Sequence, residues 1–136
     1  MEERLVRGLR KLHEIDREQV GRLVAGLNDI APDFATYLVE FAFGDIYTRP
    51  ALDLRAREIA TVAALTALGT AAPQLRAHIH GALNVGCTRE EIIEVIMQMS
   101  IYAGFPAALN GLAAAKAVFA ERGDAQCATC RIGEGG

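Results

Sequence analysis

Two residues near the middle of the chain have the side-chain chemistry for moving protons. Imidazole changes its charge near neutral pH, so His78 is a candidate proton donor. Glu58 precedes it in the sequence, and a turn over residues 69–73 between two antiparallel helices could bring the two together. A carboxylate at that position orients the imidazole and favours its protonated form. Glu58 and His78 therefore form the predicted catalytic pair.

Basic and phenolic side chains flank this pair and indicate an anionic substrate. A guanidinium group binds a carboxylate through two parallel hydrogen bonds, and Arg55 and three other arginines lie in the same region. The Tyr102 phenol could donate a hydrogen bond to a developing oxyanion. His80 is two residues after His78, so it faces another side of a helix. Taken singly, each of these side chains is more often a solvated or interface group. The predicted substrate-binding set is Arg49, Arg57, Arg76, His80 and Tyr102.

Helices must position these residues, because apolar side chains recur with helical spacing almost throughout the chain. We therefore predict an all-α fold. Local start and stop signals support it: N-caps at Asp16 and Asp53, a stop at Gly69, and a capping box from Thr88 to Glu91. The signals predict helices over residues 5–12, 16–27, 32–44, 53–68 and 73–84, then one from Thr88 to a break at 104–106, and a last one ending near residue 122.

Composition excludes several classes of protein. Lys and Arg total 14 against 17 Asp and Glu, so the chain lacks the basic surplus that nucleic-acid binding requires. Hydrophobic residues make up 51%, yet no apolar run approaches the ~20 residues of a membrane span. The apolar excess predicts an obligate homo-oligomer. The charged N-terminus does not resemble a secretory leader, and the three cysteines suit a reducing compartment, so we expect a cytoplasmic protein.

The chain length suits one domain, which we place at residues 1–123. Residues 124–136 are polar, rich in glycine and without periodicity, so we expect a flexible tail. This tail contains Cys127 and Cys130 in a CxxC arrangement, which can be redox-active or provide half of a zinc site. No further ligand lies nearby in the tail to complete a metal site, so no metal is predicted.

Several segments resemble the carboxymuconolactone decarboxylase family, and they cover the chain from the first helix to about residue 123. The matching segments are residues 44–50 (GDIYTRP), 57–58 (RE), 61–69 (TVAALTALG), 75–78 (LRAH), 82–86 (ALNVG) and 102–108 (YAGFPAA). The resemblance implies an AhpD-like helical bundle that assembles as a trimer or hexamer and uses no cofactor. It also implies the substrate, 4-carboxymuconolactone, which loses carbon dioxide to give the enol-lactone of 3-oxoadipate in aromatic catabolism.

The resemblance favours the decarboxylase branch over the AhpD-like peroxidase branch. Glu58 matches the glutamate of the AhpD-like proton relay, but that branch has a CxxC pair before its histidine, and residues 70–77 contain no sulfur. Without a thiolate there, peroxide reduction has no nucleophile in this segment. Two alternatives remain: a thiol-dependent peroxidase or disulfide reductase that uses the tail CxxC, and a non-catalytic oligomeric module that binds a small anion.

Overall fold

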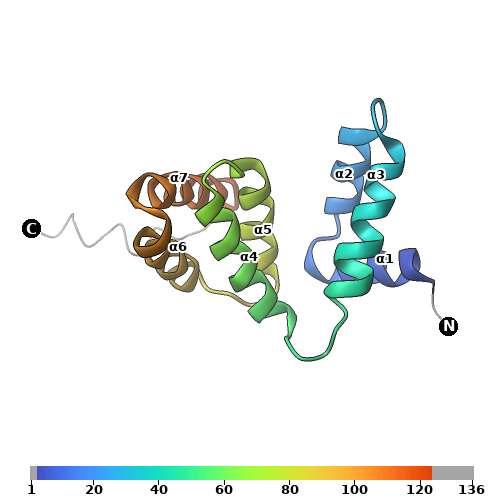
Figure 1. Cartoon of the computed structure of the whole chain (residues 1–136), viewed down its shortest axis with the longest axis horizontal. Helices are drawn as coiled ribbons and strands as arrows, with labels where there is room; N and C mark the ends of the chain where they lie inside the picture. The colour runs from blue at the N-terminus through green and yellow to red at the C-terminus, as the bar shows by residue number, and fades with distance from the viewer. Residues whose placement is uncertain (1–2, 124–136) are drawn as a thin grey trace, which may run out of the picture.

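The computed structural model describes residues 3–123, and its helices form two groups that a connecting segment links (Figure 1). The first group contains α1 (Arg4–Ile15), α2 (Gln19–Leu27), α3 (Pro32–Leu38) and η1 (Val39–Ile46), a π-helix that continues α3. The second contains α4 (Leu54–Leu68), α5 (Ala72–Asn84), α6 (Arg89–Ala103) and α7 (Phe105–Glu121). These residues include no strand, so the predicted all-α class is confirmed. The predicted tail, with Cys127 and Cys130, lies outside the described residues.

The boundaries of the second group follow the local signals in the sequence. The carboxylate of Asp53 accepts a hydrogen bond from the backbone N–H of Ala56 at 2.8 Å and starts α4. Gly69 ends that helix in the left-handed region, with φ 75°, where a side chain would be strained. Thr88 and Glu91 form the predicted capping box, with hydrogen bonds of 2.9 and 3.1 Å.

Two predictions in the first group are wrong in detail. The Asp16 carboxylate accepts from the backbone N–H of Glu18 at 3.0 Å, so it stabilises the turn after α1, and α2 begins only at Gln19. The third helix does not end at Gly44 but continues to Ile46 as a π-helix, whose last bond runs from the N–H of Tyr47 to the carbonyl of Ala42 at 2.8 Å. The residue types around Asp16 and Gly44 do not indicate the later start of α2 or the π-helix.

The second group has α4 at its centre, where it packs against α5, α6 and α7. Its buried side chains, Glu58, Val62 and Thr66, recur every four residues and form one stripe along the helix. The Thr66 hydroxyl donates to the carbonyl of Val62 at 2.7 Å, which satisfies it inside the core. Glu58 is therefore an acidic residue at a position that helical geometry buries.

The first group is held together by close backbone contact between α1 and η1. A Cβ on Gly8 would lie 2.3 Å from the carbonyl oxygen of Val39, so only glycine allows this approach. At the end of the contact the Arg4 guanidinium bonds to Asp45 at 2.6 Å and lowers the pKa of that carboxyl group. Gly8, Gly44, where a Cβ would lie 2.6 Å from the carbonyl oxygen of Arg4, and this ion pair fix η1 on α1. The η1 helix provides part of the wall of the site described below.

The two groups touch where α1 meets α5. Gly81 makes room for Ile15, since a Cβ there would lie 2.8 Å from the Cγ2 atom of Ile15. The Asn84 side chain donates to the carbonyl of Ile15 at 2.9 Å.

No helix among residues 3–123 is long and apolar enough to span a membrane. Large exposed apolar side chains lie on both groups, including Phe34, Tyr37, Phe41, Ile101, Tyr102, Phe105 and Leu109. The predicted homo-oligomer stays a prediction.

Candidate active site

His78 and Glu58 form the centre of the candidate site. The Nδ1 atom of His78 lies 3.0 Å from the Oε2 atom of Glu58, so the hairpin of α4 and α5 brings the predicted pair together. The Glu58 side chain is fully buried, and the His78 side chain is 27% exposed. The second carboxylate oxygen, Oε1, has no hydrogen-bond partner among residues 3–123. The imidazole can therefore exchange protons through Nε2 while Nδ1 remains on the carboxylate.

Tyr47 and Arg57 lie beside the buried carboxylate. Burial raises the pKa of the Tyr47 phenol, the negative charge of Glu58 raises this pKa further, and Thr61 and Arg57 oppose the shift. The phenol oxygen lies 2.6 Å from the Thr61 hydroxyl, and the Arg57 guanidinium lies over the Tyr47 ring at 5.8 Å from its centroid. Tyr47 therefore stays protonated near neutral pH.

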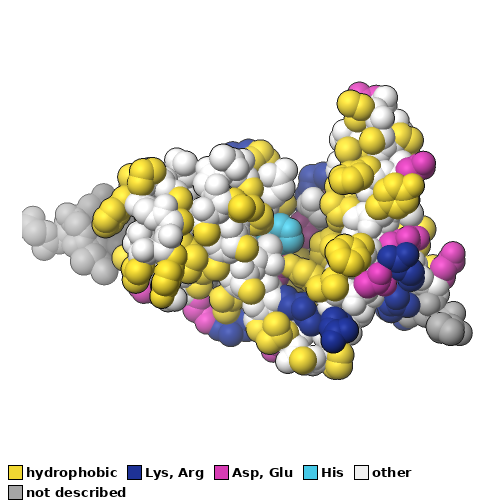
Figure 2. Space-filling model, viewed as in Figure 1, with side chains coloured by type: hydrophobic (Ala, Val, Ile, Leu, Met, Phe, Trp, Pro, Cys, Tyr) yellow, Lys and Arg dark blue, Asp and Glu magenta, His cyan; other side chains and the backbone are white. Residues whose placement is uncertain are grey.

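A cavity of about 620 Å³ opens beside His78, in the hollow between the two helix groups (Figure 2). Its volume is in the range of small-molecule sites. Apolar side chains form most of the lining: Leu12, Ile15, Leu23, Leu27, Phe34, Leu38, Phe43, Pro73 and Ala77. The polar groups are His78, Gln74, Asp16, Gln19 and Arg22. The cavity thus offers an apolar surface with one proton donor and one arginine.

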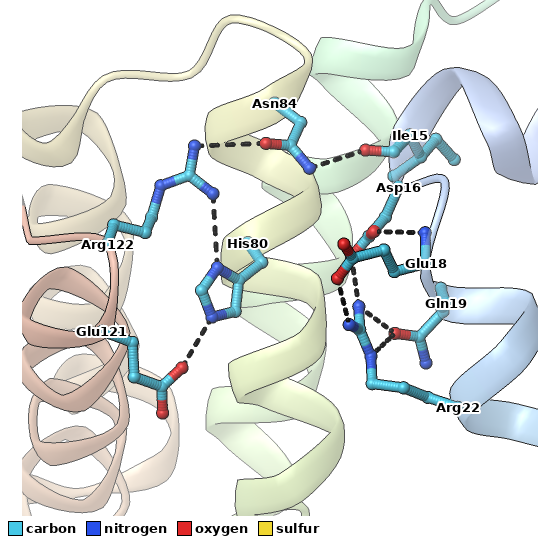
Figure 3. A network of polar contacts seen from close by, with 9 residues as sticks. All are labelled: Ile15, Asp16, Glu18, Gln19, Arg22, His80, Asn84, Glu121 and Arg122. Carbon is cyan, nitrogen blue, oxygen red and sulfur yellow. Dashed lines mark hydrogen bonds and ion pairs between the residues drawn. The ribbon is translucent and has the colours of Figure 1, made fainter. Parts of the chain in front are cut away.

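A second hollow, of about 540 Å³, lies around His80. The Nε2 atom of His80 lies 2.8 Å from Glu121, and its Nδ1 atom lies 3.2 Å from the Nη1 atom of Arg122. Arg122 also donates to the Asn84 side chain at 3.1 Å. Figure 3 shows His80 pointing toward Glu121 and Arg122, away from the cluster around Arg22. The two hollows share Asp16, Gln19, Arg22, Pro73 and Ala77, so they are neighbours.

The remaining predicted residues do not gather around His78 within one chain. Arg57 donates to the backbone carbonyl of Arg49 at 2.9 Å, so these two lie together beside Tyr47. Arg76 lines a separate hollow of about 400 Å³ with Gly69 and Asn110. Tyr102 is 75% exposed near the end of α6. Arg55, also considered as a clamp, forms an ion pair with Glu91. Their proposed roles in binding substrate stay predictions.

Sequence reasoning missed the contribution of α2 to the cavity. Arg22 was not among the predicted arginines, although it is the arginine that lines the His78 cavity within residues 3–123. It looks like an ordinary exposed helical charge in the sequence, and its position depends on how α2 packs against α1 and α3. No local signal could have identified it. Within the same residues no cluster of three or more His, Cys, Asp or Glu could hold a metal ion.

Comparisons with known proteins agree with the resemblance noted in the sequence. The profile of the carboxymuconolactone decarboxylase family matches residues 32–117. A 4-carboxymuconolactone decarboxylase of Acinetobacter baylyi is 37% identical over 123 residues, which cover 90% of this chain and 91% of that protein. An uncharacterized 15.0 kDa protein of Paracoccus denitrificans is 38% identical over 96 residues, or 70% of this chain and 72% of that protein.

A nitrosuccinic acid decarboxylase of Metarhizium robertsii is more distant, at 32% identity over 76 residues, which cover 55% of this chain and 52% of the fungal protein. Two relatives are thus named as decarboxylases, which supports decarboxylation as the general activity. The matched segment includes η1, α4, α5 and α6, and so both members of the His78 and Glu58 pair. By family profile and by near full-length similarity, this chain is a member of the carboxymuconolactone decarboxylase family.

Proposed function

We propose that the protein decarboxylates 4-carboxymuconolactone, or a closely related carboxylated lactone, in the catabolism of aromatic compounds. The observation that carries the proposal is the contact of 3.0 Å between His78 and the buried Glu58, on the wall of a largely apolar cavity. The similarity to the Acinetobacter baylyi enzyme supports the choice of substrate.

The substrate itself can accept the electrons that decarboxylation releases. The bond between the ring carbon and the departing carboxylate breaks, carbon dioxide leaves, and the electron pair moves through the ring double bond into the lactone carbonyl. The resulting dienolate takes a proton at the carbon next to that carbonyl, which gives the enol-lactone. The protein must therefore position the lactone, surround the leaving carboxylate and provide one proton.

His78 is the proton donor in this scheme, and Glu58 is the residue that positions it. The protonated imidazole donates through Nδ1 to the Oε2 atom of Glu58 and through Nε2 to the dienolate carbon. A buried carboxylate without a partner on Oε1 costs about 1–3 kcal/mol of folding free energy. A role in orienting His78 accounts for a group that is costly to bury.

The apolar lining favours the step in which the charged carboxylate of the substrate leaves as neutral carbon dioxide. The leaving carboxylate carries a full negative charge in the bound substrate and none as carbon dioxide, so surroundings that solvate the anion poorly favour its departure. Leu12, Leu38 and Phe43 line the same cavity as His78, which supports decarboxylation in apolar surroundings.

The described residues offer no thiol suited to the peroxidase alternative. Burial raises the pKa of the Cys87 thiol, which is 4% exposed and donates to the carbonyl of Arg55 at 3.7 Å. A thiol of this kind is a poor nucleophile, because the thiolate is the reactive form. The alternative therefore depends on Cys127 and Cys130, which lie outside the described residues.

The test is turnover of 4-carboxymuconolactone, followed by its ultraviolet spectrum and by carbon dioxide release. We expect the wild-type protein to be active and His78→Gln to lower kcat by at least ~100-fold, the usual contribution of a positioned acid. His13→Gln is the matched control, since His13 is an exposed histidine of α1. Absence of turnover in the wild-type protein, with peroxide reduction that Cys127→Ser abolishes, would favour the thiol-dependent alternative.

A further inference from the structure

The cavity beside His78 contains a cation that the predicted clamp residues do not provide. A carboxylated lactone of the proposed class keeps one carboxylate after the other has left, and this spectator group needs a positive partner in both substrate and product. Arg49, Arg57 and Arg76 do not line the cavity, whereas Arg22 does. Arg22 comes from α2 and lies where the His78 cavity adjoins the polar hollow around His80.

We propose that Arg22 binds the spectator carboxylate of the substrate, an inference that rests on the proposed decarboxylase function. In this arrangement the lactone ring lies on the apolar side, next to His78, and the spectator carboxylate lies toward the polar hollow. The two carboxylates then have opposite surroundings. The leaving group lies against apolar side chains, while the group that keeps its charge is paired with a guanidinium, which is what each requires for decarboxylation.

The present partners of Arg22 show how a substrate could be accommodated. Its Nη2 atom bonds to Asp16 at 2.6 Å, and its Nη1 atom bonds to Glu18 at 3.1 Å. The Asp16 side chain is 14% exposed and comes from the turn between α1 and α2, so it can hold the guanidinium in place. The Glu18 side chain is 84% exposed, and such surface pairs contribute little free energy.

A substrate carboxylate can therefore replace Glu18 on Nη1 while Asp16 keeps Nη2. The guanidinium donates through Nε and Nη2 to the side-chain oxygen of Gln19, at 3.3 and 3.1 Å, which also fixes its plane (Figure 3). A guanidinium has five N–H donors, and Asp16, Glu18 and Gln19 together accept from four of them, so replacing Glu18 by a substrate carboxylate keeps that number. Glu18 thus occupies the place of the ligand in the unbound protein.

The first experiment measures kcat and KM for 4-carboxymuconolactone in Arg22 variants. We expect Arg22→Gln to raise KM by at least ~10-fold with kcat within about threefold, because the lost contact is equally strong in substrate and transition state. Arg22→Lys should lie between, since an ammonium group keeps the charge but not the paired geometry. Arg17→Gln, an exposed arginine of the same turn, is the control and should keep wild-type values. Glu18→Gln should leave KM unchanged or lower it.

A second experiment changes the substrate and compares its effect in the same protein variants. Methyl esterification of the spectator carboxylate should raise KM for the wild-type protein and for Arg17→Gln, but should cause no further rise in Arg22→Gln. If Arg22→Gln keeps the wild-type KM, or if the ester penalty is the same in both proteins, the assignment is wrong while the decarboxylase function stands.

Binding of adipate, a dicarboxylate, separates the two proposals if the wild-type protein shows no turnover. Calorimetric titration should then give saturable binding that Arg22→Gln weakens by at least ~10-fold and Arg17→Gln does not. That result would retain Arg22 as a carboxylate ligand and reject the proposed reaction. Equal binding by the wild-type protein and Arg22→Gln, or no binding by either, would reject Arg22 as well.

Discussion

The two histidines of α5 have similar geometry and different surroundings. His78 lies 3.0 Å from Glu58, and His80 lies 2.8 Å from Glu121. Their side chains are 27% and 25% exposed, so the histidines themselves do not differ in access to solvent. The carboxylates do, since Glu58 is fully buried and Glu121 is 59% exposed.

This difference shows that a contact between a histidine and a glutamate can belong to a catalytic site or can be an ordinary surface contact. Water screens the charge of Glu121, and the pair with His80 is one link in a polar network that also contains Arg122 and Asn84. The charge of Glu58 acts in a medium of low polarizability, with the imidazole as its hydrogen-bond partner among residues 3–123. The buried carboxylate is therefore the feature that favours His78 over His80 in the proposed proton transfer, and the predicted role of His80 in binding substrate stays a prediction.

The largest expected effect comes from neutralising each carboxylate in turn. Glu58→Gln keeps the shape of the side chain and its ability to accept from Nδ1, but it removes the negative charge beside the imidazole. We expect kcat to fall by about 10- to 100-fold, part of the full contribution of a general acid. Glu121→Gln is the matched change at the exposed pair and should alter kcat by less than about twofold. Steady-state kinetics with 4-carboxymuconolactone measure both.

An equal loss in the two variants would contradict the distinction between the pairs. Circular dichroism and urea unfolding of Glu58→Gln provide the control, because a fall in kcat is meaningful only if the helices persist. Because Gln keeps an acceptor for Nδ1 and removes a buried charge that is costly to desolvate, we expect folding stability to be unchanged or higher. A strongly destabilised Glu58→Gln protein would instead indicate that the carboxylate has a structural role.

The second prediction concerns packing beside the buried pair. Gly81 lies between His78 and Ala82 on α5, and a Cβ there would lie 2.8 Å from Ile15 and 3.6 Å from Glu58. Gly81→Ala must therefore push α1 away, and we expect a loss of about 1–3 kcal/mol in the free energy of unfolding. Gly21→Ala is the control on α2, where a Cβ meets nothing within 4 Å. It should stabilise the helix by about 0.5–1 kcal/mol, as measured by urea denaturation. Equal effects would show that α1 is free to move at this contact.

Local residues determine what the sequence could predict about the fold. The side chains of Asp53 and Thr88 accept hydrogen bonds from backbone N–H groups a few residues away, and Gly69 takes the left-handed conformation that ends a helix. The ends of these helices could therefore be predicted from residue types alone. The contact between Glu58 and His78 was predictable for a similar reason, because a short turn between two helices restricts how they pair. The roles assigned to these two residues still await the kinetic tests.

Packing between distant segments determines what could not be predicted. The π-helix over residues 39–46 arises in the segment that packs against α1, where Gly8 and Gly44 allow close backbone contact. Arg22 lines the cavity because α2 packs against α1 and α3, which form the wall of the cavity together with α5. The sequence analysis selected Arg49, Arg57 and Arg76 because they flank the region of Glu58 and His78, but they do not line the cavity beside His78.

A third, smaller effect should appear in the ionisation of Tyr47. Its pKa is raised above the usual value of about 10 by burial first and by the charge of Glu58 second. Because the folded pKa is higher than the unfolded one, the neutral phenol contributes stability that is fully present below pH ~10 and is lost as pH rises through the folded pKa. Glu58→Gln should therefore lower the pKa of Tyr47, and Glu121→Gln should not change it.

Ultraviolet titration of phenolate absorbance measures this shift, and Tyr47→Phe identifies the contribution of Tyr47 by difference. An unchanged titration in Glu58→Gln would mean that the carboxylate is less charged or more hydrated than its burial indicates. Tyr47→Phe itself should cost about 0.5–1.5 kcal/mol of stability, because it removes the hydrogen bond of 2.6 Å to Thr61.

The smallest effect is expected at the exposed pair of His80 and Glu121, and it tests whether this pair differs from the buried one. Glu121→Gln should change the free energy of unfolding by less than about 1 kcal/mol, and the change should shrink as salt is added, because exposed charges are screened. Urea denaturation at low and high ionic strength measures both quantities. A larger, salt-insensitive loss would mean that Glu121 is shielded from solvent in solution. The difference between the two histidines would then lie in the polarity of their hollows, and no longer in the exposure of their carboxylates.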